Sequence, residues 1–179
     1  YPHVMSLDLT GPLQVFASAN DERQRQGLPA AYRLLILGEQ PGPVPTSAGF
    51  QLVAEQAWDV AEPAHIDTLL IPGGQGDKAQ CQNLELLDWL RSAVPQIRRV
   101  GSVCSGALIL ASAGLLDGRR VTTHWADLDF LRQEHPQVTI SGDCLHTYDP
   151  QDPGGNGHIF TSAGVTAGID LALALLEAD

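Results

Sequence analysis

The residues best suited to carry chemistry lie in one short run, Gly101-Ser102-Val103-Cys104-Ser105-Gly106. An apolar segment leads into a cysteine and then into a helical pattern, which is typical of a nucleophile elbow, a strained turn flanked by small residues. Ser102 and Gly106 meet that requirement. Because a helix N-terminus favours a thiolate, the pattern predicts an exposed, activated thiol at Cys104 with a lowered pKa. The alternative is a small buried side chain, the commonest state of an unpaired cysteine.

A glycine pair supplies a second candidate feature. Pro72-Gly73-Gly74 directly follows an apolar strand-like run. Two glycines there permit positive φ and close approach of the backbone to a ligand. Together with the elbow, the N–H groups of Gly74 and Ser105 are expected to converge on one anionic oxygen. Taken alone, the motif is equally compatible with an ordinary turn between a strand and a helix.

Asp8 and His124 complete the candidate residues. Asp8 lies between two leucines just before a helix pattern. Taken alone, its carboxylate is expected to be solvated, because Asp is rarely buried unpaired; the alternative turns it inward toward a partner. His124 follows a strand pattern in a semi-polar turn. The other histidines (His3, His65, His135, His146, His158) are expected on the surface or in loops, with no metal-ligand spacing, so neither a metal site nor a cofactor is predicted.

Composition restricts the classes of function. The chain has 179 residues, 21 Asp+Glu, 10 Lys+Arg and a net charge of −11, which fits one domain that repels nucleic acid and anionic membranes. No apolar run approaches the roughly 18 residues of a membrane span, and no signal peptide pattern is present. Three scattered cysteines do not make a disulfide framework, which favours a reduced cytoplasm. Cys81 and Cys144 lack an activating context and are expected to be inert.

The elements that must position these residues alternate between strand and helix. This alternation predicts one α/β domain over residues 1–179, a three-layer sandwich with a mostly parallel central sheet flanked by helices. Residues 150–157 are expected to form a loop, and residues 41–45 a turn-rich break. Helices are predicted at 12–25 (with Pro12 first), 84–94, 105–113 (closed by Gly114), 125–134 and 165–177. Extended segments are predicted at 32–37, 47–55 (a hairpin or an edge strand), 66–71, 99–103, 121–122, 138–140 and 159–161.

These motifs together resemble the PfpI/ThiJ superfamily, which has a class I glutamine amidotransferase-like fold. The resemblance spans nearly the whole chain through residues 7–12, 72–74, 103–106, 122–125 and 161–170. It implies that Cys104 is the elbow cysteine, that Asp8 contacts it, and that His124 lies nearby. It also implies ligand contacts from Gly73, Gly74 and the Ser105 amide. Ser105 stands where PfpI-type proteases carry His, which argues against peptidase activity.

Two branches of the superfamily compete. Residues 161–179 and 131–136 look more like the N-terminal domain of AraC-family transcriptional regulators, and Ser105 in place of Thr departs slightly from isonitrile hydratases. The first branch implies a ligand-sensing, dimerising domain that binds a small metabolite beside Cys104. DNA would be contacted only through a helix-turn-helix domain beyond residue 179. The second implies an isonitrile hydratase-like enzyme with Cys104 as nucleophile and Asp8 as acid/base. A third reading is a scaffold whose cysteine is only structural.

Two expectations concern the surroundings of the domain. The helix predicted at 165–177 is apolar nearly all round, so a covering surface is needed, and a homodimer is expected. The resemblance also implies a buried strand before Tyr1.

Overall fold

The apolar run at residues 99–103 forms the central strand of the molecule. In the computed structural model, which describes residues 1–179, every residue of β6 (Arg99–Val103) is buried. On one side β6 pairs in parallel with β5 (Thr68–Ile71), and on the other with β9 (Ile159–Ser162). Side chains at alternate positions of such a strand point to opposite faces, so both faces need a helical cover.

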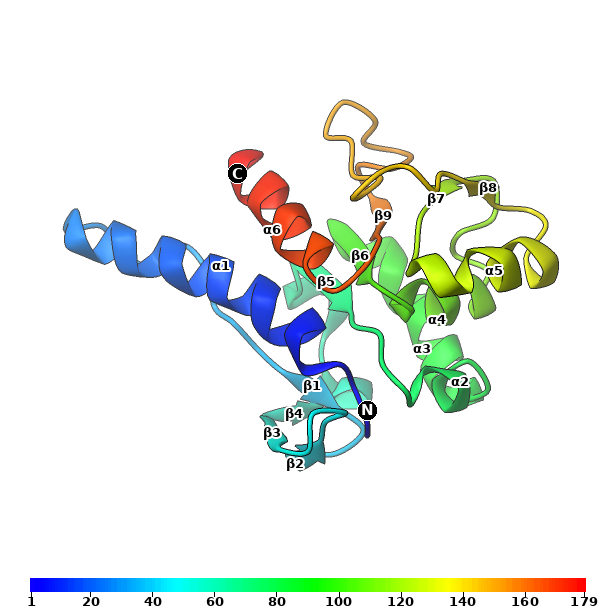
Figure 1. The fold of residues 1–179 in the computed structure, drawn as a ribbon. Helices are drawn as coiled ribbons and strands as arrows, with labels where there is room; N and C mark the ends of the chain where they lie inside the picture. Colours follow the sequence, from blue (N-terminus) through cyan, green and yellow to red (C-terminus); the bar gives the residue numbers. More distant parts are fainter.

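The predicted α/β architecture is confirmed (Figure 1). The helices are α1 (Ser6–Arg25), α2 (Asp77–Gln80), α3 (Leu84–Ala93), α4 (Gly106–Ser112), α5 (Leu128–Glu134) and α6 (Ala167–Glu177). The short 3-10 helices are η1 (Trp58–Val60), η2 (Pro63–His65), η3 (Val94–Gln96) and η4 (Trp125–Asp127). The remaining strands are the parallel pairs β1 (Leu37–Gly38) with β4 (Gln56–Ala57) and β7 (Arg120–Val121) with β8 (Thr139–Ile140), and the antiparallel pair β2 (Gly42–Pro45) with β3 (Gln51–Ala54). None of the helices combines the length and the apolarity that crossing a bilayer would need.

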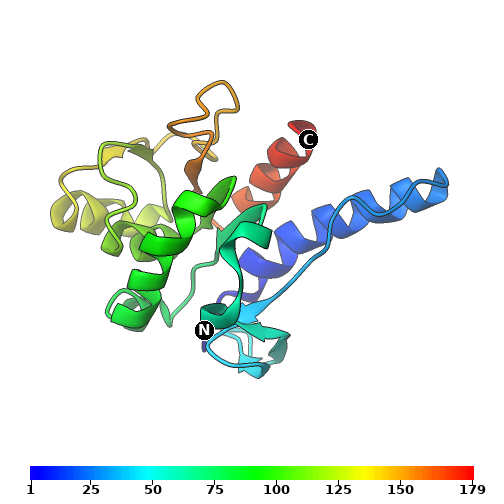
Figure 2. The same cartoon turned by 180° about the vertical axis from the view of Figure 1, so that it is seen from behind.

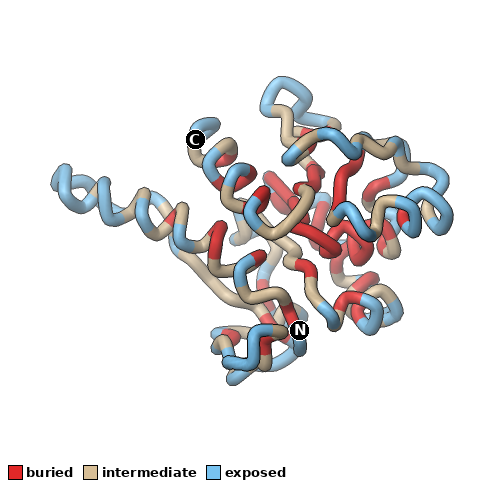
Figure 3. Tube along the Cα trace, in the orientation of Figure 1, coloured by how far each residue is buried: buried red, intermediate tan, exposed pale blue.

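Two apolar clusters fix the layers. On one face of the three central strands, Phe160 packs with Phe16 of α1 and Leu171 of α6. On the other face, Val100 packs with residues of α3, α4 and α5. The two views agree that α1 and α6 lie on the side opposite α3 and α4 (Figures 1 and 2). Burial is greatest along β6 and α4, whereas the C-terminal half of α1 projects from the body and is mostly exposed (Figure 3).

The first helix begins earlier than the sequence pattern predicts. The predicted start with Pro12 as first residue is wrong: α1 begins at Ser6 and contains Pro12 in its interior. A tertiary contact holds the additional turn, because the carboxylate of Asp8 accepts a hydrogen bond from the Gly73 N–H at 2.9 Å. Thr10 adds a local bond from its hydroxyl to the Ser6 carbonyl at 2.9 Å. Both hydrogen bonds stabilise the helical turn that precedes Pro12.

Two further predictions of local structure need correction. Of the strand predicted at 32–37, only Leu37 lies in a ladder, as part of β1, because residues 32–36 have no neighbouring strand. The break predicted at 41–45 is wrong: Gly42–Pro45 is strand β2, paired with β3 as a hairpin. Prolines are tolerated in such a two-stranded ribbon, where one edge needs no N–H donor. The hairpin itself was one of the alternatives for residues 47–55.

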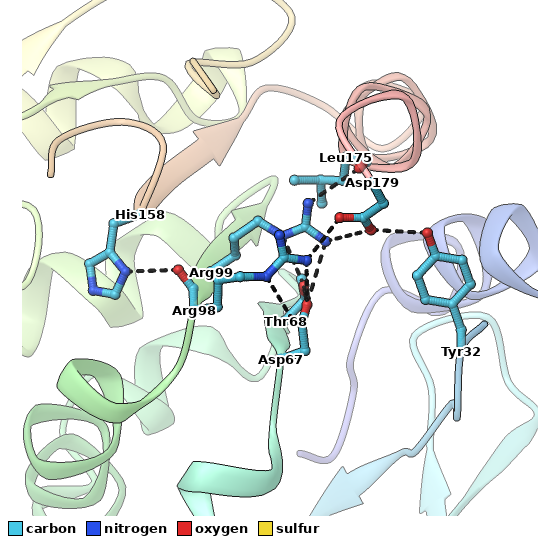
Figure 4. Close-up of polar contacts among 8 residues, drawn as sticks. All are labelled: Tyr32, Asp67, Thr68, Arg98, Arg99, His158, Leu175 and Asp179. Atoms are coloured by element: carbon cyan, nitrogen blue, oxygen red, sulfur yellow. Dashed lines mark hydrogen bonds and ion pairs between the residues drawn. The ribbon is translucent and has the colours of Figure 1, made fainter. Parts of the chain in front are cut away.

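A network of charged groups ties together the edge at which β5 and β6 begin (Figure 4). The side chain of Arg99 is only 3% exposed, and its guanidinium lies 2.9 Å from the carboxylate of Asp179. Arg98 binds the same carboxylate at 2.8 Å and Asp67 at 2.7 Å. The Tyr32 hydroxyl donates to Asp179 at 2.9 Å. This network fastens the end of α6 to the central strands.

Candidate functional site

The elbow predicted around Cys104 is present. Cys104 has φ +56°, an uncommon conformation for a residue other than glycine, and it joins the end of β6 to the start of α4. Gly106 is required there, because a Cβ at this position would overlap the carbonyl oxygens of Ile71 and Pro72. The α4 helix ends as predicted, with Gly114 at φ +74°. The local spacing of small residues therefore predicts this backbone correctly.

The environment of the thiol differs from the prediction. Cys104 is only 6% exposed, so the predicted exposed thiol is wrong. Burial, as the largest cause, and the charges of Asp8 and Asp127 together raise the pKa of Cys104 to about 12, although the Ser105 amide opposes the rise. Desolvation and a neighbouring carboxylate thus outweigh the N-terminus of a short helix. Cys104 is a neutral thiol at physiological pH.

Asp8 is turned inward and not solvated. Its side chain is 1% exposed, which corrects the expectation from the residue alone and agrees with the position that the resemblance implies. Oδ2 accepts the Gly73 N–H, whereas Oδ1 is buried and has no hydrogen-bond partner. Burial raises the pKa of Asp8 to about 6, and the Gly73 N–H opposes this rise. A buried carboxylate oxygen without a partner is costly unless a ligand or water satisfies it.

The two glycines and Ser105 form a tightly closed group beside Asp8. Gly74 has φ +137°, and its N–H donates to Ser105 Oγ at 3.1 Å. The Gly74 amide is therefore already bonded within the protein, and does not stand free for an anionic oxygen as expected. A hydroxyl that accepts one bond can still donate its own proton, so the group available to a ligand is the Ser105 O–H. Gly73 has no room for a side chain, because a Cβ would lie 2.6 Å from Ser105 Oγ and 3.0 Å from Asp8 Oδ2.

His124 lies at the edge of this group. It caps η4, where its Nδ1 accepts from the Ala126 N–H at 3.4 Å and lies 3.9 Å from Asp127 Oδ2. Its side chain is 31% exposed, and its charge, when present, lowers the pKa of Asp8. No hydrogen bond joins His124 to Asp8 or Cys104. A direct catalytic role for His124 remains a prediction.

Sequence reasoning missed Thr123. Its hydroxyl donates to the Cys104 carbonyl at 2.8 Å in a buried position, and this hydrogen bond stabilises the backbone of the elbow. Thr123 lies in the same motif as His124, so the sequence did draw attention to this segment. The spacing of residues does not show, however, which group a threonine hydroxyl bonds. Cys81 and Cys144 are half-buried, and burial raises the pKa of Cys81. No cluster of three or more His, Cys, Asp or Glu side chains is arranged to hold a metal ion.

Comparison with known proteins identifies this arrangement. The DJ-1/PfpI family model matches residues 2–178. The chain belongs to the DJ-1/PfpI family. This confirms the resemblance inferred from the motifs, and with it the fold. The elbow cysteine, the buried Asp8 and the glycine pair all lie within the residues that the family model matches.

The relatives of this DJ-1/PfpI domain include both an enzyme and transcriptional regulators. The isonitrile hydratase of Pseudomonas putida is 36% identical over 177 residues, which are 99% of this chain and 68% of that protein. The HTH-type transcriptional regulator CdhR of Pseudomonas aeruginosa is 32% identical over 145 residues, which are 81% of this chain but 40% of the regulator. A THiJ/PfpI family protein from Pseudomonas syringae has a solved structure with a TM-score of 0.79 and 30% identity, covering 98% of this chain and 64% of that one.

Proposed function

We propose that this domain is the ligand-sensing and dimerisation domain of an AraC-family transcriptional regulator. It binds a small metabolite beside Cys104, and a separate helix-turn-helix domain contacts DNA. The relative CdhR supports this division, because this chain matches only 40% of its length. The net charge of −11 also favours a domain that does not itself contact phosphates.

The observation that carries the proposal is the protonation state of Cys104 together with the polar groups beside it that have no partner. Cys104 is a buried thiol whose pKa is about 12, so little thiolate is present for attack on a substrate. The same site offers two groups to a bound molecule, the unpartnered Oδ1 of Asp8 and the hydroxyl proton of Ser105. A ligand that satisfies these groups is held without turnover. Its occupancy would shift a conformational equilibrium that a DNA-binding domain reads.

A binding measurement with a turnover control tests this function. Small nitrogen-containing metabolites are titrated into the purified chain by calorimetry, and the mixture is then analysed for new products. We expect saturable binding without product, and a loss of at least about tenfold in affinity in Asp8→Asn, because the buried acceptor is removed. Asp129→Asn is the matched control, since Asp129 has an 84% exposed side chain. Product formation, or equal binding by both variants, contradicts the proposal.

A second candidate function is isonitrile hydration, favoured by the 36% identity over nearly the whole chain. In this mechanism, the terminal carbon of the isonitrile receives both the sulfur and the proton of the Cys104 thiol, which gives a thioimidate. Water then adds across the carbon–nitrogen double bond, with its hydroxyl on carbon and its proton on nitrogen. The carbon–sulfur bond breaks as the hydroxyl proton returns to the sulfur, which releases the N-formamide and the thiol. Asp8, whose pKa is about 6, is suited to move these protons near neutral pH.

The hydratase function is tested by incubating the chain with cyclohexyl isocyanide and measuring the N-formamide. If the domain is an enzyme, product accumulates catalytically and Cys104→Ala abolishes it. A panel of isonitriles without product excludes this chemistry for the chain.

A further inference from the structure

Three carboxylates lie near Cys104 in buried or half-buried positions. Asp8 is 1% exposed, and Asp77, the first residue of α2, is 8% exposed. Asp127, the last residue of η4, has a side chain that is 31% exposed. Aspartate is rarely buried unless its charge is paired. The burial of these three side chains therefore raises the question of which positive charge they bind.

The glycine pair connects two of these carboxylates to the elbow. The Gly73 N–H donates to Asp8 Oδ2 at 2.9 Å. The Asp77 N–H donates to the Gly74 carbonyl at 3.0 Å, so α2 begins directly beside the glycine pair. The Gly74 N–H in turn donates to the hydroxyl of Ser105, the residue that follows the elbow cysteine. Asp8 and Asp77 are thus positioned beside the elbow by one short segment.

Asp127 approaches the thiol from the segment that follows β7. The Thr123 hydroxyl donates to the Cys104 carbonyl at 2.8 Å, and Asp127 follows in η4. Burial is the main cause of the raised pKa of Cys104, but the charges of Asp8 and Asp127 both add to it. Burial also raises the pKa of Asp127, and the charge of Asp77 raises it further. Three negative charges therefore act on one small region around the sulfur.

No basic side chain of the protein neutralises these charges. None of the three carboxylates makes an ion pair with a lysine or an arginine. The basic groups that act on Asp127 are His124, at 3.9 Å, and Lys78, which is exposed. By contrast, the buried Arg99 is paired with Asp179 at 2.9 Å. The region around Cys104 thus has an excess of negative charge that the protein itself does not balance.

One oxygen in this region is available to a hydrogen-bond donor. Asp8 Oδ1 is buried and has no partner. A metal ion would need several ligands at coordination distance, and no three His, Cys, Asp or Glu side chains are arranged in that way. An ammonium group needs only one acceptor at hydrogen-bond distance, because more distant carboxylates still attract its charge. The geometry therefore suits an ammonium group better than a metal ion.

We propose that the site beside Cys104 binds a small ammonium compound, which donates an N–H to Asp8 Oδ1, and that Asp77 and Asp127 select for its positive charge. This inference names the ligand class of the sensing function proposed above and rests on that function. An anion of the same size is repelled by all three carboxylates. A quaternary ammonium ion carries the charge but has no N–H, so it leaves Oδ1 without a donor.

Calorimetric titration of the purified chain with four probes tests the ligand class. The probes are n-butylammonium, tetramethylammonium, n-butanol and butyrate. We expect n-butylammonium to bind at least about tenfold more tightly than n-butanol, because it forms a charge-assisted hydrogen bond. Tetramethylammonium should bind more weakly than n-butylammonium, and butyrate should not bind.

Substitutions test the two residues assigned to charge selection. Asp77→Asn and Asp127→Asn should each weaken the binding of n-butylammonium about three- to tenfold and leave that of n-butanol unchanged. This difference separates a loss of charge from a loss of structure, since a distorted site would bind both probes more weakly. Asp129→Asn is the matched control, because Asp129 is exposed and pairs with Arg132. It should change neither affinity.

The pH dependence of binding tests the contact with Asp8. Because the pKa of Asp8 is about 6, its ionised fraction falls about tenfold between pH 7.5 and pH 5, and the affinity for n-butylammonium should fall at least as much. The probe itself stays charged over this range. Of the other groups that face Asp8, Cys104 and the Tyr1 hydroxyl stay neutral, and protonation of His124 acts in the same direction. Asp8→Asn should bind the probe weakly at both pH values.

Several results would overturn the inference. They are the absence of n-butylammonium binding, equal binding of n-butylammonium and n-butanol, tighter binding of tetramethylammonium, an unchanged affinity in both Asp77→Asn and Asp127→Asn, and an affinity that does not depend on pH. The sensing function fails separately. A neutral compound that binds without product, while n-butylammonium does not bind, keeps the sensing function and removes this inference. Conversion of bound n-butylammonium to a product removes the sensing function and keeps the ligand class.

Discussion

Replacement of Asp8 by Asn tests how the site controls its thiol. Relative to an ordinary cysteine pKa of 9.0, a pKa of about 12 at Cys104 lowers the thiolate fraction near neutral pH by about a thousandfold. Burial is the largest cause of the raised pKa of Cys104, and the negative charge of Asp8 is the second largest. Asn keeps an oxygen that can accept the Gly73 N–H but carries no charge. We expect the pKa of Cys104 to fall by about one unit and to stay above 9, because the burial remains.

The assay is the rate of alkylation by iodoacetamide between pH 7 and 10, followed at each cysteine by peptide mass spectrometry. Cys81 and Cys144 serve as internal references, and Asp129→Asn controls for a general loss of surface charge. Asp8→Asn should make Cys104 react about tenfold faster at a given pH. If Cys104 of the parent chain reacts at pH 7 to 8 as fast as a free thiol, the burial argument is refuted. If Asp8→Asn changes nothing, the carboxylate does not act on the sulfur.

Three further outcomes follow from buried contacts. The pKa of Asp8 is raised from 3.8 to about 6, so protonated Asp8 stabilises the fold below about pH 4. About 3 kcal/mol of the free energy of unfolding is lost as the pH rises through 6. Urea unfolding measured from pH 4 to 8 should show this decrease in the parent chain but not in Asp8→Asn. Gly101→Ala should cost about 1–3 kcal/mol, measured at constant pH, because its Cβ would overlap the ring of Phe160. Asp179→Asn should cost about 2 kcal/mol at pH 7 by leaving Arg99 partly unpaired; since the Asp179 pKa is lowered, the difference between variant and parent should shrink as the pH falls below the ordinary range of Asp.

Much of the fold could be predicted because it depends on local patterns. β6, α3 and α4 lie close to their predicted ranges, because the signal for each lies within its own sequence. These signals are a short apolar run for β6, the helical spacing of apolar residues for α3, and a helical pattern closed by Gly114 for α4. The positive φ of Cys104 and Gly114 follows from the same kind of local signal. The elements that were mispredicted depend on distant partners. The start of α1 is held by Gly73, and residues 32–36 have no ladder because no strand lies beside them.

The candidate site divides in the same way. The sequence by itself brought Cys104 and the Gly73 backbone together, because the carboxyl ends of parallel strands share one edge of a sheet, but it did not predict that Asp8 turns inward to join them. Only the tertiary structure decided what these groups can do. Asp8 is bonded to a residue 65 positions away and Gly74 to one 31 positions away, and these partners leave Asp8 Oδ1 and the Ser105 hydroxyl proton as the free groups. Burial then keeps Cys104 a neutral thiol. Spacing along the chain sets backbone conformation, whereas desolvation and hydrogen-bond partners depend on what packs around each group in space.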